Sequence, residues 1–115
     1  MKEVYAEDPV VYVTQEQPHI NYAQAEQFGD IVFCSLDDVP PVHGSLRTGR
    51  VTAAMASKME GYRAGVDYIL PSGSPLNIAA VMMLAGRRGD RHNILKWESR
   101  AKQYSRVLLE VPSGV

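Results

Sequence analysis

VDYILPSGSPLNIAAVMMLAGRR, residues 66–88, carries the clearest strand, turn and helix signal in the chain. Its first residues are typical of a strand, and a turn rich in serine and glycine follows them. Ser74 can cap a helix and Pro75 can take the first helical position, so the pattern predicts a helix over 75 to about 88. The body of this helix is apolar nearly all round, which predicts that it is largely buried.

The segments upstream of this stretch alternate between strand and helix signals. Short runs of β-branched and aromatic residues predict buried strands over 10–14 and 30–35, and the first of these is expected to be central in a sheet. One or two helical turns are predicted between them, over 22–28. Apolar residues at helical spacing predict an amphipathic helix over 47–62.

The C-terminal part predicts a β-hairpin and completes the fold. Two strand-like runs, 92–98 and 104–111, flank a short polar connection, which favours an antiparallel pair. The order of elements predicts one α/β domain over residues 1–115. We expect a small, mostly parallel Rossmann-like sheet with helices on its faces and a C-terminal antiparallel hairpin.

Length and composition narrow the class of protein. A chain of 115 residues has room for one domain, and 45% hydrophobic with 22% charged residues is typical of a soluble globular protein. No apolar run is long enough to cross a bilayer, and the N-terminus lacks the apolar segment of a secretory signal. The single cysteine, Cys34, agrees with a reducing compartment.

The charges are distributed unevenly along the chain. Residues 1–57 carry three basic and eight acidic side chains, whereas residues 58–115 carry nine basic and five acidic ones. A molecule with an acidic and a basic half is suited to docking on a charged partner or to self-association. The alternative is that these charges form ordinary solvated faces.

The turn before the helix is the first candidate for a ligand site. In open α/β sheets, ligands bind at the carboxyl ends of the strands, where the amides and the dipole of a helix N-terminus attract anions. Gly73 would let a ligand approach the backbone. Ser72, Ser74 and Asn77 could donate hydrogen bonds to phosphate or ribose oxygens. The alternative is that Ser74 and Pro75 merely start a helix.

The end of the first strand is the second candidate. Thr14, Gln15 and Glu16 would emerge at the same edge of the sheet if the two strands are parallel neighbours. Together with the turn, they would bind a base or a ribose. Alternatively, they are exposed loop residues.

No familiar catalytic or metal-binding pattern is present in the sequence. His19, His43 and His92 are isolated from one another, so we expect no metal site and no cofactor. Cys34 lies in an apolar run, which favours a buried, inert thiol over a nucleophile. We therefore expect no enzymatic activity.

Basic residues of the second half are candidates for contact with a partner. With Trp97 and Tyr104 interleaved, they suit nucleic acid, because cations neutralise phosphates and an aromatic ring stacks on an unpaired base. The net charge of −1 argues against a dedicated nucleic-acid binder, and Trp97 is expected against the core or under an arginine stem. The candidate partner-binding residues are Arg87, Arg88, Arg91, Arg100 and Lys102.

Four short segments carry a resemblance: VYVTQE at 11–16, FGDIV at 28–32, GSPLNIA at 73–79 and ILKWESR at 94–100, followed by Tyr104. Together they are similar to a group of small tailed-bacteriophage proteins with Val-Thr-Gln-Glu, Phe-Gly-Asp, Gly-Asp-Pro and Leu-Lys-Trp-Asp-Arg motifs. Here Ser74 and Glu98 stand where that group has Asp. Serine keeps the helix cap but lacks a carboxylate for a cation or a ribose. The resemblance implies phage origin rather than an activity.

Small phage proteins commonly act by binding, so we rank three functions. The first is a non-enzymatic accessory protein in the host cytoplasm that binds a host protein and modulates or inhibits it. We rank it first because the uneven distribution of charge can be read directly from the sequence. The second is a sponge for a small nucleotide signal at the strand ends. The third is a nucleic-acid-binding protein. A homo-oligomer is compatible with each of them.

Overall fold

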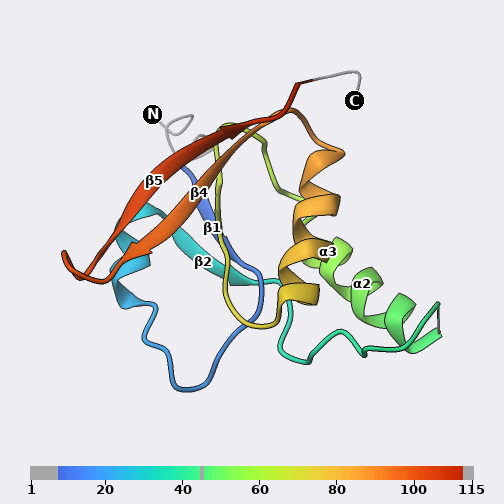
Figure 1. The fold of residues 1–115 in the computed structure, drawn as a ribbon. Helices are drawn as coiled ribbons and strands as arrows, with labels where there is room; N and C mark the ends of the chain where they lie inside the picture. The colour runs from blue at the N-terminus through green and yellow to red at the C-terminus, as the bar shows by residue number, and fades with distance from the viewer. Residues whose placement is uncertain (1–7, 45, 113–115) are drawn as a thin grey trace.

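The computed structural model describes residues 8–44 and 46–112 (Figure 1). One sheet of five strands has the order β2-β1-β3-β4-β5. β1 pairs in parallel with both β2 and β3, and β3 pairs in parallel with β4, whereas β4 and β5 are antiparallel. The strands are β1 Val10–Val13, β2 Asp30–Phe33, β3 Tyr68–Leu70, β4 Arg91–Glu98 and β5 Gln103–Glu110.

The α/β class, the central place of the first strand and the terminal hairpin are confirmed. The expectation of a mostly parallel Rossmann-like sheet is confirmed only in part, because the sheet is mixed: the described β1–β2, β1–β3 and β3–β4 pairings are parallel and the β4–β5 pairing is antiparallel. The connection over 99–102 is too short for a crossover to a parallel strand, which needs about a dozen residues or more. β5 therefore returns directly beside β4 in the opposite direction.

Within the described ranges, three helical segments lie on the two faces of the sheet. The 3₁₀ helix η1, Ala23–Phe28, covers one face, and α2, Leu46–Lys58, lies beside α3, Pro75–Gly86, on the other (Figure 1). Ser74 caps α3 as predicted, since its Oγ accepts a hydrogen bond from the amide of Leu76 at 3.2 Å. Among the described residues, no helix is long and apolar enough to cross a membrane.

The prediction that α3 is largely buried is wrong. Asn77, Val81 and Ala85 face the interior, but Leu76 and Met83 are 47% and 74% exposed. A helix that lies on one face of a sheet can bury only the stripe that faces the sheet and its neighbouring helix. The outer side of α3 faces solvent within the described part of the chain (Figure 1).

Each face of the sheet has its own apolar core. Side chains alternate along a strand, so Tyr12 packs with the α2 and α3 side while Val11 and Val13 pack with the η1 side. Beyond these, the first core includes Met55, Met59, Tyr62, Ile69, Val81 and Ile94, and the second includes Tyr22, Ala25, Tyr68, Leu70 and Leu95. The second core is adjacent to the candidate site described below.

The buried carboxylate of Asp67 links the N-terminal ends of strands β1 and β3. Asp67 is fully buried just before β3, and its Oδ1 accepts a hydrogen bond from the amide of Val10 in β1 at 2.9 Å. Its Oδ2 accepts from the amide of Arg63 at 2.7 Å, and the guanidinium of Arg63 lies 2.9 Å from Oδ1. These bonds satisfy a charge that would otherwise be costly to bury.

Candidate binding site

The carboxyl ends of β1 and β3 meet at one edge of the sheet, as the sequence predicts for parallel neighbours. The polar groups at this edge bind one another. Oγ1 of Thr14 donates to the carbonyl oxygen of Ser72 at 2.6 Å and accepts from the amide of Ser72 at 2.7 Å. Both residues are buried, which contradicts the alternative that Thr14 is an exposed loop residue.

Gln15 occupies the position at which a ligand was expected. Its Oε1 accepts a hydrogen bond from the amide of Ser74 at 2.8 Å, so this amide of the α3 N-terminus has a partner within the protein. Its Nε2 donates to the carbonyl oxygen of Leu36 at 3.0 Å and to Asp38 at 2.7 Å. Gln15 is buried and links two loops to the helix, so it too is not an exposed loop residue.

The close approach of Gln15 explains why position 73 requires a glycine. Its φ is +88°, and a Cβ there would lie 2.2 Å from Oε1 of Gln15. Only glycine has both the backbone freedom and the space that this close approach requires. The glycine signal in the sequence therefore reflects internal packing at this position.

Asn77 and Glu16 are the remaining two residues that the sequence predicts to bind a ligand. Asn77 is fully buried, and its Nδ2 donates to Oγ of Ser35 at 2.8 Å while its Oδ1 accepts from the amide of Val39 at 2.9 Å. Glu16 is half-buried, and its amide donates to the carbonyl oxygen of Ser35. The predicted residues come together in space, and the hydrogen bonds of Thr14, Gln15, Ser72, Ser74 and Asn77 hold the loops of this edge to one another.

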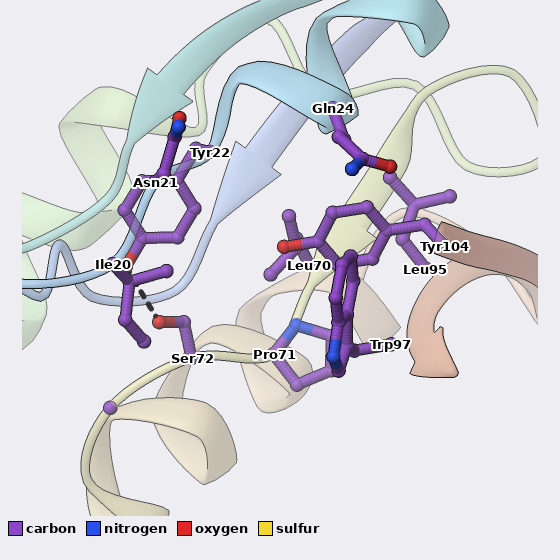
Figure 2. Close-up of a pocket in the computed structure, with 11 residues that line it drawn as sticks. Ile20, Asn21, Tyr22, Gln24, Leu70, Pro71, Ser72, Leu95, Trp97 and Tyr104 are labelled. Atoms are coloured by element: carbon purple, nitrogen blue, oxygen red, sulfur yellow. Dashed lines mark hydrogen bonds between the residues drawn. The ribbon is translucent and has the colours of Figure 1, made fainter. Parts of the chain in front are cut away.

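An open pocket lies beside this edge, on the face covered by η1 (Figure 2). Its volume is about 530 Å³, within the range of small-molecule sites in proteins. The walls come from the loop before η1, from η1 itself, from the turn after β3 and from the β4–β5 hairpin. The lining residues are Ile20, Asn21, Tyr22, Gln24, Leu70, Pro71, Ser72, Gly73, Leu95, Trp97 and Tyr104.

Two aromatic side chains of the hairpin form one wall of the pocket. Trp97 and Tyr104 are opposite each other in the β4–β5 register, and their ring centroids are 4.9 Å apart in an edge-to-face arrangement. Trp97 is 43% exposed, so the expectation that it packs against the core or under an arginine stem is wrong. Trp97 lies near the C-terminal end of β4, two residues after Leu95, which is buried in the core on the η1 side.

The pocket is neutral and has hydroxyl and amide groups around apolar walls. Tyr22 and Ser72 share a hydrogen bond of 2.8 Å, and Figure 2 shows it opposite the hairpin rings. Burial, and next the neighbouring Tyr22, raise the pKa of Tyr104, so its hydroxyl stays protonated at neutral pH. None of the described lining residues is charged.

Sequence reasoning missed this pocket because its walls are distant in sequence. The hairpin register was the available signal: a connection over 99–102 places Trp97 opposite Tyr104 on one face. The contribution of Ile20, Tyr22 and Gln24 depends on how the loop before η1 folds back onto the sheet. No local pattern indicates that fold.

The basic residues proposed for partner contact fall into two groups. Arg87, Arg88 and Arg91 lie at the end of α3 and the start of β4, whereas Arg100 and Lys102 lie in the hairpin turn. The length of β4, about 23 Å, separates them. Nη1 of Arg88 donates to the carbonyl oxygens of Glu60 and Tyr62, both at 3.1 Å. Nε of Arg91 lies 3.6 Å from Oε2 of Glu110.

His19 and His43 are exposed, whereas His92 and Cys34 are buried. Nε2 of buried His92 donates to the carbonyl oxygen of Gly89, and its Nδ1 shares a hydrogen bond with the hydroxyl of Tyr62. Burial raises the pKa of the Cys34 thiol to about 12, so it is protonated at neutral pH. Among the described residues, no cluster of histidine, cysteine, aspartate and glutamate has the arrangement of a metal site.

Comparison with known protein families gives a match over nearly the whole chain. A family model described as Phage Pam3 gp32-like protein matches residues 9–111, nearly the whole chain. Searches of curated proteins and of solved structures found no match. The phage origin implied by the sequence resemblance is confirmed at the level of the family. The chain, with its mixed sheet and its pocket beside the ends of the central strands, belongs to the Phage Pam3 gp32-like protein family.

Proposed function

We propose that this phage protein is a non-catalytic accessory protein that binds and modulates a host protein along its edge strand β5. The supporting observation is the exposure of large apolar side chains on and just after this strand. Val107, Leu108, Leu109 and Val111 are 37% to 55% exposed. An exposed run of apolar residues on an edge strand is a liability in an isolated protein, and proteins that keep one commonly use it for recognition.

The backbone of β5 is suited to accept a further strand. The amide of Val111 donates to the carbonyl oxygen of Asp90 at 2.9 Å, in register with the β4–β5 ladder. Because bonding alternates along an antiparallel pair, Arg106 and Leu108 have their amides and carbonyls directed away from β4. An extended host segment would pair with these groups by strand addition.

The charges near the two ends of β5 indicate the composition of that segment. Arg91 lies beside Glu110 at one end, and Arg100 and Lys102 lie in the turn at the other. At the first end the charge of Arg91 is balanced by Glu110, so the unbalanced positive charge lies at the turn. A host segment with an apolar centre and an acidic residue beside the turn would match this pattern. Of the basic residues that the sequence singles out, Arg100 and Lys102 would then contact the host segment.

A second copy of the chain is the competing occupant of the same edge. In a twofold antiparallel pair centred on Leu108, Arg106 of each copy would lie opposite Glu110 of the other. Light scattering on the purified protein separates the two cases. We expect a monomer. A dimer that Arg106→Glu dissociates would assign the strand to self-association and contradict the proposal.

The binding test uses a variant that blocks strand addition and spares the fold. Proline is tolerated on an edge strand where its amide would face solvent, so Leu108→Pro removes an outward donor without breaking the β4–β5 ladder. We expect affinity capture from host extract, read by mass spectrometry, to recover a defined host protein with the wild type and to lose it with Leu108→Pro.

The matched control is Met83→Asp, which changes the exposed outer side of α3, away from β5. It should capture the host protein as the wild type does. Equal capture by the wild type and Leu108→Pro, with unchanged circular dichroism, would remove β5 from the interaction.

A further inference from the structure

We propose that the pocket between the loop before η1 and the β4–β5 hairpin binds the base of a nucleoside. This pocket lies on the η1 face of the hairpin and includes Tyr104 of β5, whereas the edge contact proposed above uses the outward backbone groups of Arg106 and Leu108. It is also distinct from a phosphate site at the start of α3, where the amide of Ser74 is engaged by Gln15. The inference rests on the shape of the pocket, its aromatic wall and its neutral polar groups.

The shape of the pocket fits a planar ring. Figure 2 shows Trp97, Tyr104 and Pro71 gathered on one side and Tyr22 and Ile20 on the other, with open space between them. Aromatic side chains bind bases by stacking, which tolerates different bases because each has a π face. The volume of about 530 Å³ accommodates a base with part of its sugar.

The polar groups of the pocket fit the edge of a base better than a hydrocarbon. Nε1 of Trp97 and the hydroxyl of Tyr104 have no hydrogen-bond partner among the residues that the structure describes. The side-chain amides of Asn21 and Gln24 also line the pocket. That of Gln24 can donate and accept, and Nδ2 of Asn21 can donate, whereas Oδ1 of Asn21 already accepts from the amide of Ala23 at 2.8 Å. A base offers donors and acceptors in its plane, where these groups can reach them.

The absence of charge in the described lining identifies which part of the ligand the pocket holds. Phosphate oxygens would lose water without gaining a cation, so a phosphate is not favoured inside. The base then supplies the affinity and the phosphate stays in solvent. It follows that a nucleoside and its 5′-monophosphate should bind with similar affinity, within about threefold of each other, which is less than 1 kcal/mol.

Trp97 is the chain's one tryptophan, so its fluorescence reports directly on the pocket. The experiment titrates the full chain with adenosine, guanosine, cytidine and uridine, and then with their 5′-monophosphates. We expect saturable quenching by at least one nucleoside. Tyr104→Leu removes half of the aromatic wall and keeps the reporter, and it should weaken binding about tenfold or more.

Two controls keep the result interpretable. Met83→Ala lies outside the pocket and should leave the affinity unchanged. Gln24→Trp would place a ring at the rim, and calorimetry should show lost binding even if Tyr104→Leu unfolds. Leu108→Pro should bind the nucleoside as the wild type does, which separates this site from the β5 contact.

Three results would overturn the proposal. The first is the absence of saturable quenching with all four nucleosides at concentrations up to about 10 mM. The second is binding of monophosphates without binding of nucleosides, which would indicate a phosphate site. The third is unchanged affinity in a folded Tyr104→Leu variant and in Gln24→Trp.

Discussion

β3 and β5 both carry consecutive large apolar residues in one sheet, yet these residues have opposite surroundings. All residues of Tyr68–Leu70 are buried, whereas most residues of Gln103–Glu110 are exposed. β3 has β1 and β4 as neighbours and an apolar layer on each face, while β5, among the residues that the structure describes, pairs only with β4. The position of a strand in the sheet, rather than its β propensity, therefore decides what the strand can bind.

The largest predicted effect lies at the beginning of β3. Asp67→Ala removes the acceptor for the amide of Val10 and leaves the Arg63 guanidinium without its buried carboxylate. We expect a loss of roughly 3 to 5 kcal/mol in unfolding free energy, measured by urea denaturation. Asp90→Ala, at an exposed position, is the control and should change little. Equal stability of the two variants would show that β3 needs no such anchor.

The next effect lies at the other end of β3. Gly73→Ala places a methyl group 2.2 Å from Oε1 of Gln15 in a left-handed backbone conformation. We expect a loss of roughly 1 to 3 kcal/mol in unfolding free energy. Gly44→Ala has a φ of +56° and no neighbouring atom within 4 Å, so the difference between the two variants isolates the close approach. No difference would mean that Gln15 moves aside at negligible cost.

The smallest effect is expected on β5. Leu109→Gln changes a side chain that is already half in solvent, and thermal denaturation should give an unfolding free energy within about 0.5 kcal/mol of the wild type. Leu70→Gln on β3 is the matched substitution and should cost several times more, because it buries an amide in an apolar layer. A comparable loss in both variants would indicate that β5 is covered in solution.

Local signals in the sequence predicted most of the elements. The Ser74 cap with Pro75 fixed the start of α3, and the short polar connection correctly indicated the hairpin. The predicted helix over 47–62 ends earlier, at Lys58, although Tyr62 is still buried in the core. Patterns of this kind depend on neighbours within a few residues, which is why they succeed.

The candidate site depended on contacts that local patterns do not encode. Polar residues at strand ends correctly predicted that Thr14 and Ser72 meet, but not that their polar groups satisfy each other. Gln15 reaches Leu36 and Asp38, more than 20 residues away along the chain. Whether a polar side chain binds a ligand or its own protein depends on such distant partners.

Because the thiol of Cys34 is buried, a thiol reagent can be directed to a cysteine introduced on the protein surface. Maleimide reagents react with thiolates, and the pKa of about 12 leaves almost none of this cysteine ionised at neutral pH. Since the chain has one cysteine, a new cysteine placed on an outer strand would be modified selectively while the native one stays intact. Dyes, spin labels or cross-linkers can thus be attached to the folded wild-type background.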